Sequence, residues 1–255
     1  MEPPLHQEND IAYRSVPPAG EIGHLVESFW MLANQSGRPL PVTVLPDGRI
    51  DAVFSFEDRQ SIVLLGLESG PSRAEIPPDF TRFTISFRPL AASYLFKNFL
   101  PILPDSATVL PADFFGITLD EFQDMEQFCA RLTQNITGMV SKRMDERKKK
   151  LFELIYTTNG AVSVGELSEK TSWTSRQINR YCRDTIGVSL KTYCNIIRFR
   201  ASFQHIRAGR LFPDENYADQ SHFIREIKKY AGVVPKELAR NKNDRFIQFS
   251  TLPPG

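Results

Sequence analysis

The sequence has few cysteines, no long apolar run and no secretion signal. Its three cysteines (Cys129, Cys182 and Cys194) are odd in number and lack C-x-x-C spacing, which favours reduced thiols in a cytoplasm over a disulfide framework. No stretch of 18 apolar residues occurs, so we expect no membrane span. The N-terminus, MEPPLHQEND, is polar and acidic, unlike a signal peptide. These features together predict a cytoplasmic protein.

Catalytic and metal-binding signatures are also missing. The chain contains no G-x-S-x-G, Walker loop or H-E-x-x-H, and no G-x-G-x-x-G after a strand. Its four histidines are scattered along the chain, so we predict no metal site. We expect no enzyme and no cofactor. An enzymatic activity of the front half remains as a hypothesis, ranked third behind the two given below. No pair of catalytic groups in the sequence supports it.

The net charge of +1 conceals an uneven distribution along the chain. Residues 1–140 contain 9 basic and 18 acidic residues, whereas residues 141–255 contain 22 basic and 12 acidic residues. An acidic front half joined to a basic back half indicates that one domain faces a polyanion and the other has a different task. We therefore predict a sensing or dimerisation domain at 1–140, ending in a helical segment, and a second domain at 141–255.

The front half reads as an α+β domain with a curled, mainly antiparallel sheet. The stretch PVTVLPDGRIDAVFSF (41–56) has two apolar runs around Pro-Asp-Gly, which predicts a hairpin turn. In FTRFTISFRP (80–89) the apolar residues alternate with polar ones, as in a strand. We expect a short helix at 90–100. Helical spacing over 118–140 continues into 141–157, with a basic run at 147–150 that is a solvated helix end or a phosphate contact.

The back half reads as helical throughout. Ser163-x-x-Glu166 and Thr174-x-x-Gln177 are capping boxes that predict helix starts near 163 and 174. Helix, short turn, helix is the layout of a helix-turn-helix. A shift of 45 residues overlays TSRQINRYCRDTIGVSL on the phrase that begins at Asp219, and each copy ends in a glycine, Gly187 or Gly232. The repeat predicts two equivalent units.

Each copy has one apolar stripe and one stripe of basic and amide side chains. Such groups read base edges in the major groove and neutralise phosphates, which predicts binding to double-stranded DNA. The competing interpretation of one such stripe is a solvated amphipathic helix. We expect Trp173, in the turn before the first stripe, to pack against the scaffold helix. The candidate DNA-binding residues are Arg176, Asn179, Arg180, Arg183, Gln220, Ser221, His222, Arg225 and Lys228.

Residues 160–240 resemble the DNA-binding domain of AraC/XylS-type bacterial transcription regulators. The phrases ELSEKTSWTSRQINRYCRDTIGVSLKTY and YADQSHFIREIKKYAGVVPKEL carry the resemblance. It implies an all-α domain with two helix-turn-helix units, at about 163–187 and 208–232, joined by a helix at about 190–207. Through LPDGRIDAVFSF and FTISFRPLAA, residues 15–135 more loosely resemble the N-terminal domains of a bacterial subgroup. The resemblance implies sequence-specific regulation of transcription, with a small-molecule effector and a homodimer as further expectations.

One departure from the family supports a second hypothesis. The segment AGRLFPDEN (208–216) stands where the second scaffold helix belongs, but Gly209 and Pro213 are poor helix-interior residues. We expect an irregular scaffold with apolar contacts from Leu211 and Phe212. The alternative function is therefore a ligand-binding or protein-interaction module whose DNA-binding unit has decayed.

Overall fold

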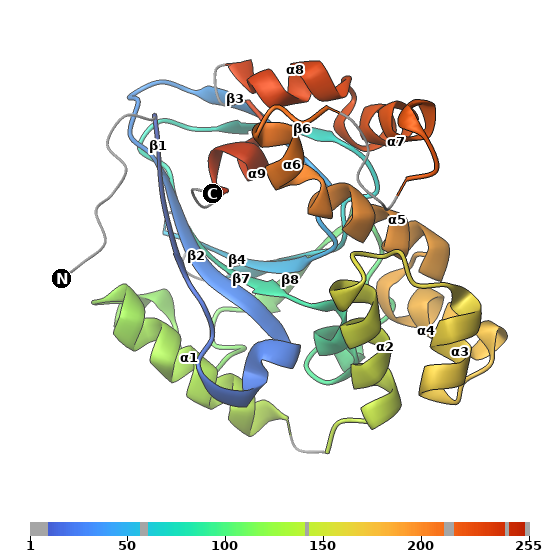
Figure 1. Cartoon of the computed structure of the whole chain (residues 1–255). Coiled ribbons are helices and arrows are strands. Elements are labelled where there is room, and N and C mark those ends of the chain that lie inside the picture. Colours follow the sequence, from blue (N-terminus) through green and yellow to red (C-terminus); the bar gives the residue numbers. More distant parts are fainter. Residues whose placement is uncertain (1–9, 57–60, 141–142, 212–216, 243–244, 253–255) are drawn as a thin grey trace. The chain divides into compact units, whose positions relative to one another are not determined.

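The computed structural model describes residues 10–56, 61–140, 143–211, 217–242 and 245–252 (Figure 1). The chain forms two compact units. The first, called the sheet unit, contains residues 1–40, 49–66 and 76–144. The second, called the helical unit, contains residues 41–48, 67–75 and 145–255. Two short stretches of the front half thus belong to the helical unit, which differs from a single division at residue 140.

The sheet unit is built on six strands in the order β1-β2-β7-β4-β5-β8, and the strand registers are antiparallel. This confirms the predicted α+β class. The strands are β1 (Ile11–Val16), β2 (Val26–Asn34), β4 (Ile50–Ser55), β5 (Ser61–Leu65), β7 (Thr81–Phe87) and β8 (Ala107–Pro111), and helix α1 spans Met125–Met139.

One face of this sheet is packed with aromatic rings. Alternation in β7 directs Phe83, Ile85 and Phe87 to the same side, and all three are fully buried. Phe128 of α1 meets the ring of Phe83 edge-on at 5.2 Å between centroids. The alternate residues Thr84 and Ser86 are also fully buried, so the period-two pattern located the strand but did not predict burial on both faces.

Two helix predictions in this unit need correction. Residues 90–100 form no α-helix; the chain makes two 3-10 turns instead, Pro89–Ser93 and Lys97–Phe99. The helix expected over 118–140 begins only at Met125, because Asp124 caps it by accepting hydrogen bonds from two backbone N–H groups. Before it, Leu119–Glu121 is a separate 3-10 turn, and another spans Gly20–His24.

The helical unit confirms the all-α prediction for the back half and adds a two-stranded ribbon to it. Its ribbon is β3 (Leu40–Val44) with β6 (Ser72–Ile76). Its helices are α2 (Glu146–Thr157), α3 (Val164–Thr171), α4 (Ser175–Ile186), α5 (Leu190–Ala201), α6 (Phe203–Arg207), α7 (Gln220–Ala231), α8 (Pro235–Arg240) and α9 (Ile247–Ser250).

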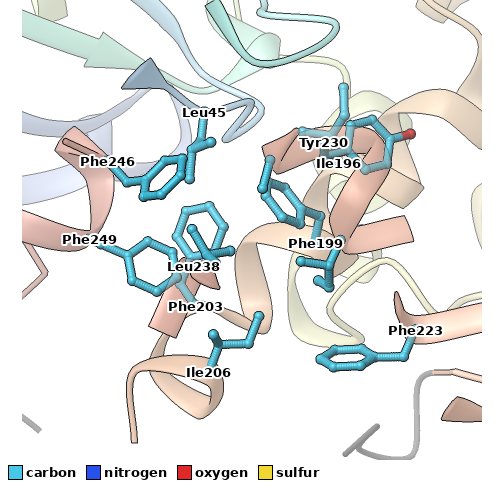
Figure 2. Close-up of a cluster of buried hydrophobic side chains, with 12 residues drawn as sticks. Leu45, Ile196, Phe199, Phe203, Ile206, Phe223, Tyr230, Leu238, Phe246 and Phe249 are labelled. Carbon is cyan, nitrogen blue, oxygen red and sulfur yellow. The ribbon is translucent and has the colours of Figure 1, made fainter. Parts of the chain in front are cut away.

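The ribbon overturns the predicted hairpin at Pro-Asp-Gly. Strand β3 pairs with β6, whereas β4 pairs with β5 and β7. The physical reason lies just beyond β3, where Leu45 is fully buried in the helical core, as Figure 2 shows beside Phe246. The side-chain amide of Gln248 also accepts a hydrogen bond from the Leu45 N–H at 2.8 Å and donates one to its carbonyl at 2.9 Å.

The joining helix predicted at 190–207 is broken. Helix α5 ends at Ala201 after 12 residues and α6 follows as a five-residue turn. The Ser202 hydroxyl donates to the Phe199 carbonyl at 2.6 Å, which competes with the helical backbone bonds there. Helix α5 is therefore about 18 Å long rather than the roughly 27 Å expected of 18 residues.

Candidate nucleic-acid interface

Helices α3 and α4 are joined by a tight turn whose ends are fixed by local hydrogen bonds. The Ser163 side chain accepts from the Glu166 N–H at the start of α3. Ser172 then adopts a left-handed conformation with φ 54°, and Thr174 and Gln177 form the capping box that starts α4. Both predicted helix starts are confirmed. They could be predicted from the sequence because each cap joins groups only three residues apart.

Helix α4 divides into a buried stripe and a basic face. The buried residues Ile178, Cys182, Thr185 and Ile186 recur at helical spacing. On the opposite side Arg176, Arg180 and Arg183 are exposed. Gly187 ends the helix at φ 70°, which is the left-handed cap expected from the sequence.

Helix α7 repeats this arrangement. Asp219 accepts a hydrogen bond from the His222 N–H at its start, and Gly232 ends it at φ 72°. The buried residues are Phe223, Ile227, Tyr230 and Ala231. Gln220, Ser221, Arg225 and Lys228 are exposed. Both α4 and α7 pack on α5, so the two capped helices are positioned by one common element of the helical unit.

The basic residues of both faces are unpaired within the described part of the chain. Arg176, Arg180, Arg183, Arg225 and Lys228 make no ion pair with a described residue. Paired cations occur nearby, since Lys170 bonds Glu166 at 2.6 Å. Unpaired cations on one helix face are available to bind anions from outside the protein.

Asn179 and His222 have local partners. The Asn179 side chain donates to the Ser175 carbonyl one turn earlier at 3.0 Å, and it is only half-buried. His222 accepts from the Ala218 N–H at 3.4 Å, and its ring lies against Tyr217. Base contact by either side chain would require it to leave its present partner. Their assignment to base readout stays a prediction, like that of the other candidate residues.

The second unit differs from the first in what precedes its exposed helix. Residues 208–211 and 217–219 form no helix, and Gly209 has a φ of 75°. Phe212 lies outside the described residues, whereas Leu211 packs against the aromatic core shown in Figure 2. The helix before this segment is α6, which starts at Phe203 and contacts α8. Within 208–216, where the scaffold of the second unit was expected, the described residues therefore contain no helix equivalent to α3.

Aromatic residues connect α2 to α4 and to the turn that precedes α4. Trp173, in the turn before α4, meets Tyr181 edge-on at 5.3 Å between ring centroids. The guanidinium carbon of Arg147 lies 5.2 Å from the Trp173 ring centroid, and the ammonium of Lys148 lies 4.9 Å from that of Tyr181. Trp173 packs within the protein, as expected, but these contacts are with α2 and α4. Tyr181 was not predicted, because Trp173 lies in the turn before α4 and helical spacing does not extend to it.

The cysteines belong to the packing of the two units. All three are buried and unpaired. Burial raises the pKa of Cys129 and Cys182 to about 12 and that of Cys194 to about 11. The neutral thiol is therefore the form present at physiological pH. No group of three or more His, Cys, Asp or Glu is placed to hold a metal ion within the described ranges.

The second face of the sheet unit carries a short chain of polar groups. The Trp30 indole donates to the Ser86 hydroxyl at 2.8 Å, and that hydroxyl donates to Asp51 at 2.7 Å. Thr84, opposite Trp30 in the strand register, is fully buried, and its hydroxyl has no hydrogen-bond partner among the described residues. Buried hydroxyls normally have partners, which makes this face the candidate for ligand contact.

Comparisons with known proteins add a match for the front half. The family described as a domain of unknown function, DUF6597, matches residues 14–108. Comparison with curated proteins finds no match. Among solved structures, ToxT from Vibrio cholerae O395 is 13% identical with a TM-score of 0.41, covering 90% of this chain and 96% of that one.

A second similar structure is unsaturated fatty acid bound ToxT from Vibrio cholerae strain SCE256. It is 10% identical, has a TM-score of 0.39, and covers 90% of this chain and 94% of that one. Because both scores are below 0.5, these similarities support no functional argument. None of the described helices has the length and apolarity to cross a bilayer.

Proposed function

We propose that this chain regulates transcription by binding double-stranded DNA in a sequence-specific way, as an AraC-type regulator, with α4 as its principal base-reading helix. The observation that carries the proposal is the repeated helix of the helical unit. Helices α4 and α7 share a side-chain N-cap, a buried stripe, unpaired cations and a left-handed terminal glycine. A single basic helix can simply be solvated, whereas two basic helices positioned by a common element are suited to binding a long polyanion such as DNA.

The roles within α4 follow from the chemistry of its side chains. A guanidinium can donate two parallel hydrogen bonds to guanine, and each good bidentate pair gives about 1–3 kcal/mol of discrimination. Arg176 and Arg180 lie one helical turn apart on the exposed face, which suits contacts to neighbouring base pairs. Arg183 lies a further turn along and is assigned to phosphate or base contact.

We assign a smaller share of the base readout to α7. It lacks a scaffold helix like α3 in the described residues that precede it. Its exposed residues Gln220, Ser221, Arg225 and Lys228 retain the chemistry for DNA contact. We therefore expect contacts from α7 to contribute less to specificity than those from α4.

Control by a small molecule is assigned to the polar face of the sheet unit. The Trp30, Ser86 and Asp51 chain and the unpartnered Thr84 hydroxyl supply donors and acceptors on one face. A ligand with a hydroxyl or carbonyl would satisfy Thr84, and its binding would stabilise the folded state. Thermal shift against a small-molecule library tests this, with Thr84→Val as the variant that should lose the response.

The test of the function is selection of bound fragments from genomic DNA by the full chain, followed by titration across a salt series. The proposal requires a preferred sequence and affinity that falls steeply with salt. A module with a decayed DNA-binding unit is the second candidate, favoured by the irregular segment before α7. It predicts ligand or protein binding and no preferred fragment even at low salt.

A further inference from the structure

The first turn of α2 lies against α4 and the turn that precedes it through two contacts between cations and aromatic rings. Lys148 is one helical turn before the buried Phe152, and both residues are near Tyr181 of α4. Arg147, its neighbour, covers Trp173 in the turn that precedes α4. Trp173 and Tyr181 contact each other. The turn of α2 is thereby fixed beside the helix that carries Arg176 and Arg180.

Position along α2 separates Lys148 from the other lysines of the basic run. Lys148 precedes the buried residues Leu151, Phe152 and Ile155 by three, four and seven positions, so it belongs to the stripe that packs inward. Lys150 is about 200° further round the helix. It is exposed and lies 3.8 Å from Glu153 on the outer side. The run therefore contains one lysine aimed at α4 and another aimed away from it.

The dimensions of DNA indicate what a cation beside α4 would face. The major groove is about 12 Å wide, and an α-helix with its side chains is about 10–12 Å across, so a reading helix fills the groove. A cation on the flank of that helix then faces the phosphates that border the groove. Tyr181 is on the flank of α4, one residue after Arg180, and the Lys148 ammonium lies over its ring.

We propose that Lys148 contacts a DNA phosphate beside the groove that α4 enters, with Tyr181 holding its ammonium in place. The inference rests on the proposed function and adds a backbone contact from outside the two reading helices. Attraction to the ring restricts the lysine side chain before DNA arrives, so less rotamer freedom is lost on binding. Arg147 is a positioning residue, because two of its nitrogens already donate to Asp145 at 3.1 and 2.7 Å.

The test compares Lys148→Gln with Lys150→Gln in the full chain. The probe is a fluorescein-labelled duplex of about 30 base pairs and mixed sequence, because a phosphate contact carries no sequence information. Affinity is measured from 50 to 200 mM salt. Affinity falls with salt, so the slope of log affinity against log salt is negative. Loss of one phosphate contact makes this slope shallower by about 0.9. We expect this change for Lys148→Gln, with a threefold to tenfold weakening at low salt, and an unchanged slope for Lys150→Gln.

Two further variants separate a contact from a structural effect. Lys148→Arg keeps the charge and should retain the parent slope, and Tyr181→Leu should weaken binding while thermal melts confirm folding. Equal slopes for Lys148→Gln and the parent would overturn the assignment while DNA binding by the parent stands. A loss confined to one preferred sequence would also overturn it, since that would indicate base reading. A parent that binds no duplex would instead refute the proposed function.

Discussion

Replacement of Leu45 by alanine tests whether a stretch of the front half is part of the helical unit. Leu45 is fully buried in a hydrophobic cluster built by residues of α5 to α9 and by Phe246, beside which it lies (Figure 2). Truncation of a fully buried leucine costs about 2–5 kcal/mol, because it removes apolar contacts and leaves a cavity. A domain is stabilised by only about 5–15 kcal/mol. Leu45→Ala should therefore lower the melting temperature of the full chain by about 4–20 °C.

The assay combines thermal unfolding with hydrogen exchange of the backbone amides. Exchange should accelerate in α5 and α9, which contribute residues to the cluster that contains Leu45. Val109→Ala is the matched control, since Val109 is 67% exposed in β8 and its truncation should change stability by less than about 0.5 kcal/mol. Should Leu45→Ala behave like this control, the ribbon would not belong to the helical core and the two units would have to be redrawn.

Three other predictions concern the helical unit. Gly160→Ala should cost more than about 1 kcal/mol by chemical denaturation, because Gly160 has a φ of 73° and an added Cβ would lie 2.1 Å from the Cys194 carbonyl oxygen. Gly165→Ala, with no atom nearer than 3.9 Å, should be neutral or stabilising. Equal losses for the two variants would contradict the local geometry. Val234→Ser should stabilise by about 1 kcal/mol in the same assay, since Val234 caps α8 with extended backbone (φ −76°, ψ 158°) but no side-chain acceptor; a loss would show that its side chain packs. Burial raises the pKa of Cys182 and Cys194 to about 12 and 11 from 9.0. Their contribution to stability is therefore complete below pH 9 and is lost as pH rises towards those values. Neither thiol should react with iodoacetamide at pH 8 before unfolding, and rapid labelling of the native protein would contradict their burial.

The parts of the structure that sequence predicts well are those determined by neighbours in the chain. The caps at Ser163, Thr174 and Asp219 and the glycine at 187 involve groups within four residues of each other. Local chemistry alone therefore places the boundaries of α3, α4 and α7. The exposed faces of α4 and α7 follow from the same periodicity, and so does the list of candidate DNA contacts.

The parts that sequence did not predict depend on distant partners. Leu45 is held by Gln248, 203 positions away, and nothing in the Pro-Asp-Gly turn indicates that β3 leaves the sheet. Burial of Thr84 likewise depends on packing around both faces of β7. In these two cases tertiary contacts override a local pattern that would otherwise have continued. The break at Ser202 has a local cause, the bond of its hydroxyl to the Phe199 carbonyl three residues earlier, which the apolar spacing of the neighbouring residues does not reveal.

The proposed function depends most directly on Arg180. The decisive measurement is the affinity of Arg180→Ala, Arg225→Ala and the exposed control Arg240→Ala for the preferred genomic fragment and for mixed-sequence DNA. We expect Arg180→Ala to weaken specific binding by about 5-fold to 150-fold, corresponding to one lost bidentate base contact, with an unchanged melting temperature and a smaller loss for Arg225→Ala. Full affinity of Arg180→Ala for the preferred fragment would contradict the assignment of α4 as the reading helix.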